Sequence, residues 1–399
     1  MPGSAERQGD GKGAGLRAGQ DPSAGRPADR EDAEVESFFA DRRRLAETAL
    51  FVLLLLAAIY VFLPKLVGLD DALAKLDEGD PVWLAIAFGF NLLIYIAYIA
   101  LFRGVVGESV IHLEWTESYE ITMASLAASR IFSAGGAGGI ILTYWALRKA
   151  GLERRRAACR MVALIVLLYA VYLAALIVFG VLLRTGVLPG NAPIGLTIVP
   201  AAIAGVVIAI FLLIALIPED FERRFAGWSA GYRFGRFARR LATVPDTLAR
   251  GTRTAIAFVR EPSRGSLALI GTLGFWAANI GTLWACFKAF GVEVPIGVVV
   301  QGYFVGMVAN LIPGAPGGVG TVDAGMIGAF VLFGIPSDSV FPAVLIYRLF
   351  AFWLPVLPGA IAFLQLRGTV ARWDRERRQG VPVGATAAHA RAPILQKVK

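Results

Sequence analysis

The sequence predicts an all-α polytopic membrane protein with about six full transmembrane helices and two oppositely oriented re-entrant helical hairpins, in an inverted-repeat-like order. Three observations predict this class. The 399 residues are 56% hydrophobic and 17% charged, a balance typical of helical membrane proteins. Several apolar runs reach the ~20 residues that cross a hydrocarbon core. Lysine and arginine gather in separate clusters, as they do in cytoplasmic loops.

The apolar runs divide the chain into a membrane domain and two polar ends. We expect residues 1–44 to be a disordered cytoplasmic tail, because they mix both charge signs with glycine, proline and serine. We expect residues 368–399 to be a disordered basic cytoplasmic tail. The transmembrane domain covers residues 45–367, and its predicted full spans are 46–67, 82–101, 158–183, 196–217, 265–290 and 340–364.

Two further apolar regions, 119–147 and 296–334, are interrupted by glycine-rich stretches. Their limbs of about 11 to 17 residues reach only ~17–26 Å as helix, so most cannot cross the membrane. A single crossing by 119–147 would put the basic cluster 148–160 and the interval 218–264 outside, against the positive-inside rule. A hairpin entering from the cytoplasm keeps both inside, and the second hairpin then enters from outside. Inverted repeats with broken helices are an architecture of transporters.

The interval 218–264 is the longest polar stretch between spans and contains ten arginines with aromatic residues among them. This pattern indicates a cytoplasmic amphipathic helix on an anionic membrane face. RNA binding is the alternative, and the flanking spans favour the membrane. We therefore expect anionic headgroups at the cytoplasmic face as partners, and no nucleic acid.

The stretch from Asn310 to Asp323 breaks the second hairpin with two prolines, four glycines and a carboxylate. Irregular backbone is tolerated inside a bilayer only where it is buried in protein or lines a wet cavity. The stretch is therefore predicted to form a site or the entrance to one.

The segments Pro316-Gly-Gly-Val-Gly-Thr-Val-Asp323 and Leu345-Ile-Tyr-Arg348 resemble the flippase-like membrane domain of the lysylphosphatidylglycerol synthase family. The resemblance covers roughly residues 45–367. The family more often has Glu at the position of Asp323, and its first hairpin often carries a Gly-Glu that Gly135–Gly139 lacks. The resemblance implies lipid translocation or assistance to it. Bifunctional members add a soluble aminoacyl-transfer domain; about thirty residues follow here, so we expect a stand-alone form that does not synthesise aminoacyl lipid.

The candidate substrate-binding residues are Arg130, Asp323 and Arg348. An arginine at depth costs at least ~2.5–3.5 kcal/mol on insertion scales, so it needs a partner. For both arginines that partner is a lipid phosphodiester, which a guanidinium binds bidentately, or a structural bond to a hairpin carbonyl or to Asp323. Asp323 binds a cationic headgroup, carries a proton, or pairs with an arginine; alternatively it serves a helix start that Thr321 caps.

Gly317, Gly318 and Gly320 are also candidate substrate-binding residues, because their amides can face an anion at a helix start. Serving the sharp turn is the other interpretation. We expect no metal or cofactor and no enzyme activity, since His112 and His389 are isolated and no catalytic set of side chains is visible.

The sequence therefore predicts a multi-pass cell-membrane protein with both termini in the cytoplasm. Its predicted function is to translocate or scramble a phosphate-bearing lipid, of phospholipid or polyprenyl type, between leaflets. The alternative is a non-transporting subunit that binds lipid or scaffolds a lipid-modifying transferase. Membrane lipids are the expected partners, and a homo-oligomer and a partner transferase both stay open.

Overall fold

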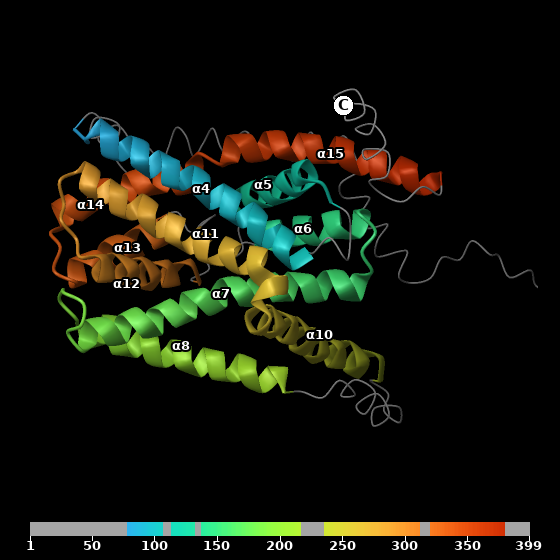
Figure 1. The fold of residues 1–399 in the computed structure, drawn as a ribbon, viewed down its shortest axis with the longest axis horizontal. Coiled ribbons are helices and arrows are strands. Elements are labelled where there is room, and N and C mark those ends of the chain that lie inside the picture. The colour runs from blue at the N-terminus through green and yellow to red at the C-terminus, as the bar shows by residue number, and fades with distance from the viewer. Residues whose placement is uncertain (1–77, 107–112, 132–136, 217–234, 312–319, 380–399) are drawn as a thin grey trace, which may run out of the picture. The chain divides into compact units, whose positions relative to one another are not determined.

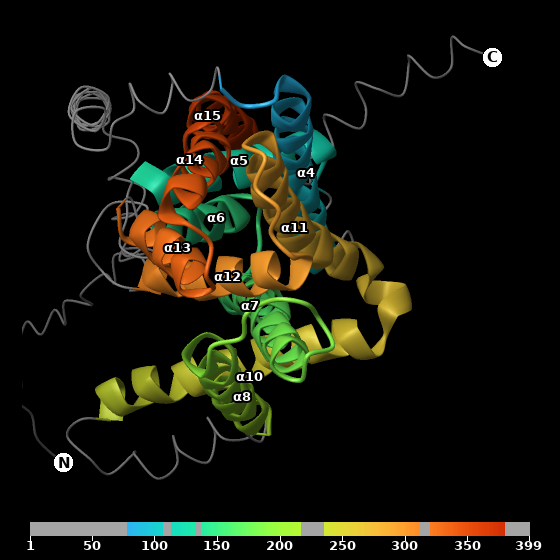
Figure 2. The ribbon, with the colours of Figure 1, turned by 90° about the vertical axis from the view of Figure 1, so that its left-hand side faces the viewer.

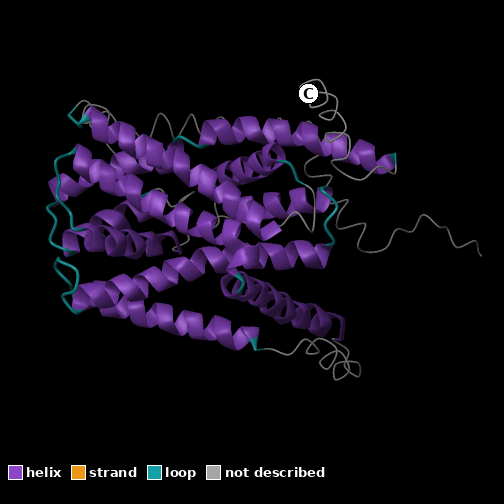
Figure 3. Cartoon of the chain, in the orientation of Figure 1, coloured by secondary structure: helices purple, strands orange, loops and turns teal. Residues whose placement is uncertain are grey.

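The computed structural model describes residues 78–106, 113–131, 137–216, 235–311 and 320–379, all within one compact unit that begins at Leu69. The described residues are helical and include no strand (Figure 3). The predicted tail 1–44 and the first predicted span, 46–67, lie outside them.

Five helices of the described chain are long and apolar enough to cross a membrane, by length and composition. They match the five remaining predicted spans, which confirms an all-α polytopic membrane protein. These helices are α4 (Pro81–Val106), α7 (Arg154–Arg184), α8 (Ile194–Ala215), α11 (Pro262–Ala289) and the continuous run from α14 (Ser337–Arg348) into α15 (Val356–Arg378).

The two glycine-interrupted regions form helical pairs. The first pair is α5 (Trp115–Ile131) with α6 (Ala137–Lys149), and the second is α12 (Ile296–Met307), extended by a 3-10 turn (Val308–Leu311), with α13 (Thr321–Leu332). Within each pair the helices pack on each other. In Figure 1, α12 and α13 lie toward the end where α7 turns into α8, and α6 ends at the opposite end, where α7 begins.

One glycine explains how closely the first pair packs. A Cβ at Gly139 would lie 2.0 Å from Oγ of Ser129 and 2.5 Å from the carbonyl oxygen of Ser125. Only a residue without a side chain fits this approach. Gly139, the last residue of the glycine run, therefore lies in the contact between α5 and α6.

The helices that precede the two pairs, α4 and α11, pack along each other over much of their length (Figure 2). The first helix of each pair then packs against the long helix that follows the other pair: α5 lies on α15, and α12 lies on α7. Corresponding elements of the two halves thus make corresponding contacts, as the inverted-repeat-like order predicts.

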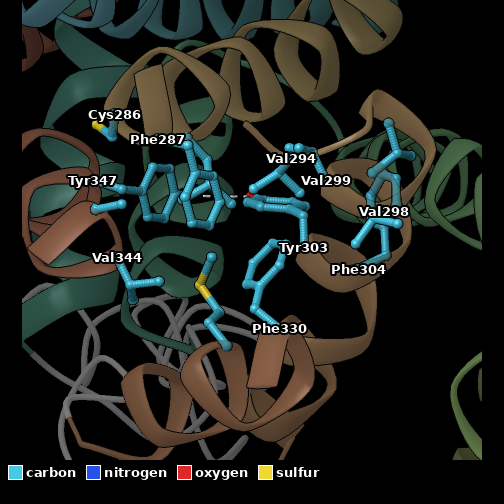
Figure 4. Close-up of a cluster of buried hydrophobic side chains, with 14 of the residues drawn as sticks. Cys286, Phe287, Val294, Val298, Val299, Tyr303, Phe304, Phe330, Val344 and Tyr347 are labelled. Carbon is cyan, nitrogen blue, oxygen red and sulfur yellow. Dashed lines mark hydrogen bonds between the residues drawn. The ribbon is translucent and has the colours of Figure 1, made fainter. Parts of the chain in front are cut away.

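The largest buried cluster lies mainly on α11, α12, α13 and α14, with further members on α4, α7 and α8; Figure 4 shows part of it. Phe287 and Phe330 meet edge-to-face with their ring centroids 4.9 Å apart. Tyr303 and Tyr347 are buried in the same cluster, where their hydroxyls lie 3.1 Å apart. Burial of large aromatic side chains dominates such packing, so α12 and α13 are held firmly beside α14.

The last helix continues beyond the predicted domain boundary. Residues 368–378 are helical, whereas the sequence predicted a disordered tail from 368. The reason is a polar contact with α5: Arg372 and Trp373 both donate hydrogen bonds to Oε1 of the buried Glu117, over 2.6 and 3.1 Å. Trp373 is itself completely buried.

The described part of the basic interval forms α10 (Gly235–Arg260), which contacts α7, α8 and α11. Its buried residues include Ala249, Thr252 and Ala255. A helix was predicted here, on the membrane face. The structure adds that one side of this helix packs on α7, so the helix is part of the bundle.

Candidate functional site

The last helix, the run from α14 into α15, is interrupted at residues 354 and 355, where the site lies. Proline has no backbone N–H, so Pro355 cannot donate to the carbonyl four residues earlier, that of Ala351. A short π-helix, Leu349–Trp353, precedes the break, and the N–H of Leu354 donates to the carbonyl of Leu349 over 3.1 Å. A π-type bond from position 355 would reach Phe350, and Pro355 cannot supply that bond either. The carbonyls of residues 350 and 351 therefore need other donors.

Side chains from two other helices supply donors to both carbonyls. Arg130, at the end of α5, donates from Nη2 to the carbonyl oxygen of Ala351 over 2.5 Å. The hydroxyl of Tyr95 on α4 donates to the carbonyl of Phe350 over 3.4 Å. Nη1 of Arg130 is shielded from solvent and has no hydrogen-bond partner among the described residues. Its guanidinium thus retains hydrogen-bonding capacity for a further acceptor.

The second pair of helices meets the same part of the last helix. Nε of Arg348, the final residue of α14, lies 2.6 Å from Oδ1 of Asp323 in the first turn of α13. The two side chains are 11% and 23% exposed, so this ion pair is largely buried. Oδ2 of Asp323 also accepts a hydrogen bond from the N–H of Gly320 over 2.8 Å.

Asp323 therefore serves the helix start and the ion pair together. Gly320 has φ of +82°, in the region that favours glycine, and it is the N-cap of α13. In the alternative interpretation of Asp323, Thr321 capped this helix; Thr321 is instead the first helical residue. The carboxylate at the third position takes over the capping role through its bond to the N–H of Gly320.

The ring of Phe352 links the two arginines. The guanidinium carbon of Arg348 lies 4.7 Å from the ring centroid, and that of Arg130 lies 5.6 Å from it. Cations within about 6 Å of an aromatic face are attracted by its quadrupole. Arginines from the end of α5 and the end of α14 therefore contact the same aromatic ring.

A buried hydroxyl network continues from the arginines into the core. Tyr347, next to Arg348, donates its hydroxyl hydrogen to Oδ1 of Asn279 on α11 over 3.1 Å, and its hydroxyl lies the same distance from that of Tyr303 on α12. Asn279 therefore makes an interhelical hydrogen bond. The network fixes the end of α14 against two helices.

The structure thus brings together Arg130, Asp323, Arg348 and Gly320. Gly317 and Gly318 lie outside the described residues. Two residues that the sequence interpretation missed are Phe352 and Pro355. A proline inside an apolar span is a visible signal that a carbonyl is released four residues earlier, so Pro355 could have been found.

The described residues contain no group of three or more His, Cys, Asp or Glu side chains that could hold a metal. The charged groups of the site are two guanidiniums and one carboxylate. Guanidiniums of this kind can bind an anion by charge and hydrogen bonding.

With this geometry in view, comparison with known proteins gives a family. The model of the lysylphosphatidylglycerol synthase TM region matches residues 48–359. The chain belongs to this family. The match includes all four of the described site residues, and it also covers residues 48–67 of the first predicted span.

Curated relatives agree with this assignment. A UPF0104 membrane protein of Methanothermobacter thermautotrophicus is 24% identical over 344 residues, covering 83% of this chain and 96% of the relative. A second UPF0104 membrane protein of that organism is 30% identical over 124 residues, covering 30% of this chain and 37% of the relative. Membership of the lysylphosphatidylglycerol synthase TM-region family indicates a multi-pass membrane protein with a lipid-related function.

Proposed function

We propose that this protein translocates or scrambles a phosphate-bearing lipid, of phospholipid or polyprenyl type, between membrane leaflets. The observation that carries the proposal is the unused hydrogen-bonding capacity of Arg130. Its guanidinium lies at the tip of α5, donates from one nitrogen to a backbone carbonyl, and has a second, shielded nitrogen without a partner among the described residues. A phosphate is the strongest common lipid acceptor for such a group.

Charge balance at the site supports the same ligand. Asp323 neutralises one positive charge through its pair with Arg348, which leaves the charge of Arg130. Residues 132–136 and 312–319, which connect the two helices of each pair along the chain, contain no charged residue in the sequence. A cation at membrane depth is costly without a counter-charge, and a lipid phosphate supplies one.

The arrangement of the helical pairs supports movement between leaflets. We interpret the pairs α5–α6 and α12–α13 as re-entrant hairpins that enter from the cytoplasmic and the outer face respectively, with both chain termini in the cytoplasm. Broken helices that meet near the midplane carry the substrate site in many transporters. The acyl chains would stay in the bilayer beside α15, whose exposed side includes Leu357, Ile361 and Leu364.

Reconstitution tests the proposal. Purified protein is placed in liposomes that carry a fluorescent phospholipid, and loss of fluorescence to an added membrane-impermeant reductant reports leaflet exchange. We expect exchange well above that of protein-free liposomes. Exchange equal to protein-free liposomes, together with capture of a lipid-modifying transferase in pull-downs, would instead support the non-transporting subunit.

A further inference from the structure

We propose that the bond between Arg130 and the carbonyl of Ala351 is a latch that a lipid phosphate opens, so that ligand binding changes the bend between α14 and α15. This inference rests on the proposed function, because it uses the same phosphate site. It adds a coupling between that site and the positions of the two hairpins.

The carbonyl of Ala351 lacks the backbone donor that a regular helix would supply. In an unbroken helix the N–H of residue 355 would donate to the carbonyl of residue 351. Pro355 has no N–H, and Arg130 donates to that carbonyl from outside the helix over 2.5 Å. A side chain from α5 thus supplies the hydrogen-bond donor that Pro355 removes from the last helix. Kinks at proline are commonly completed in this way inside membranes.

A lipid phosphate competes with the carbonyl of Ala351 for Arg130. A carbonyl oxygen is a neutral acceptor, whereas a phosphate is charged and can accept two parallel bonds from one guanidinium. Nη1 has no partner among the described residues, so the bidentate geometry becomes available if Nη2 leaves Ala351. A phosphate at this site therefore draws Arg130 away from the last helix and leaves the bend without its external donor.

The segments before and after the bend are each connected to one of the two hairpins. The segment before the bend is joined to α13 through the ion pair of Arg348 with Asp323. The segment after it is joined to α5 through Arg372 and the buried Glu117, 2.6 Å apart. A change of angle between α14 and α15 therefore moves one hairpin relative to the other, and this is the motion that alternating access requires.

The test restores the missing donor. In Pro355→Ala the new N–H can donate to the carbonyl of Ala351, which releases Arg130 without ligand. We expect roughly tenfold tighter binding of dihexanoylphosphatidylglycerol, because the phosphate no longer has to displace a bond made to a charged donor. Pro355→Ser restores the same N–H and serves as a second variant. Pro342→Ala, a proline replacement earlier in the same helix, is the matched control and should bind as the wild type does.

Distance measurement reports the bend. Spin labels on Asp338→Cys and Gly368→Cys, both exposed positions, are placed in a background lacking Cys159 and Cys286. In the wild type and in Pro342→Ala, dihexanoylphosphatidylglycerol should shift the distance distribution between the labels. In Pro355→Ala the distribution should be the same with and without lipid. Dihexanoylglycerol, which lacks the phosphate, should cause no shift, and inorganic phosphate shows whether the headgroup alone is sufficient.

The outcomes separate the two proposals. If Arg130→Gln abolishes lipid binding but lipid leaves the distance between labels 338 and 368 unchanged in the wild type, the latch is overturned and the phosphate site is preserved. Equal affinity of Pro355→Ala and wild type would also overturn the latch. Absence of any phosphate-dependent binding would overturn the proposed site and the latch together.

Discussion

Arg348 and Asp323, 25 residues apart in the sequence, form an ion pair with Nε and Oδ1 separated by 2.6 Å. The pair joins the start of α13 to the end of α14. One bond to the N–H of Gly320 uses the other carboxylate oxygen. The start of α13 is therefore fixed to the end of α14, directly before the π-helix Leu349–Trp353.

Removing the carboxylate of this pair should destabilise the protein. In Asp323→Asn the largely buried charge of Arg348 loses its counter-charge, and breaking a fully buried pair costs about 3–5 kcal/mol. Because both side chains keep some exposure, we expect about 1–3 kcal/mol, measured as a fall in the free energy of unfolding in mild detergent. Glu293→Gln is the control: the carboxylate of Glu293 is 80% exposed in its pair with Lys288, so its loss should cost below about 1 kcal/mol. Equal losses for the two variants would contradict the structural role of the buried pair.

The contact between α5 and α15 should depend on Glu117. This carboxylate is 1% exposed and accepts hydrogen bonds from Arg372, Trp373 and the N–H of Glu114. Glu117→Gln removes the charge and leaves Arg372 without its counter-ion, so we expect a loss of about 2–4 kcal/mol in the free energy of unfolding.

Glu153→Gln is the matched control for Glu117→Gln. Glu153 pairs with Arg156 three residues on, and both side chains are at least 70% exposed. Its replacement should leave thermal unfolding within error of the wild type. A smaller effect at Glu117 than at Glu153 is the result that the structure does not allow.

Two glycine-to-alanine changes should act in opposite directions. Gly139→Ala places a methyl group 2.0 Å from Oγ of Ser129, so α5 and α6 must separate, and we expect a loss of about 1–3 kcal/mol. A Cβ at Gly205 in α8 meets nothing within 4 Å, and Gly205→Ala should be neutral or stabilise by up to about 1 kcal/mol. Thermal unfolding in detergent ranks the two variants; an unaffected Gly139→Ala would mean that the two helices do not pack this closely.

Cysteine labelling checks the proposed orientation. In a background without native cysteines, Val187→Cys and Ser337→Cys should react with an impermeant maleimide added outside intact cells. Glu153→Cys and Arg375→Cys, on the face assigned to the cytoplasm, should react only after the membrane is opened. All four positions are exposed. Labelling of position 375 in intact cells would reverse or remove the assigned topology.

Much of the fold could be predicted because it depends on local signals. The five described spans follow from apolar length, and the two helical pairs follow from short apolar limbs around glycine. The pairing of Asp323 with Arg348 was among the predicted alternatives, since both charges lie in apolar surroundings and need partners.

The rest could not be predicted because it depends on contacts between distant segments. Arg130 bonds to a carbonyl 221 residues away, and Arg372 meets Glu117 at a separation of 255 residues. No local pattern specifies such partners. The helical extension to residue 378 belongs to the same class, because it depends on the packing of Trp373 against α5.

The most direct measurement of the central claim is the rate of phospholipid exchange in liposomes that contain Arg130→Gln. Glutamine removes the positive charge and is too short to place its amide where Nη2 donates to Ala351, so phosphate binding should be lost, and thermal unfolding in detergent checks that the variant is folded. Arg184→Gln, an exposed change at the end of α7, is the control. We expect an exchange rate at least roughly tenfold below wild type for Arg130→Gln and a wild-type rate for Arg184→Gln. Wild-type exchange by a folded Arg130→Gln protein would contradict the claim that Arg130 receives the lipid phosphate.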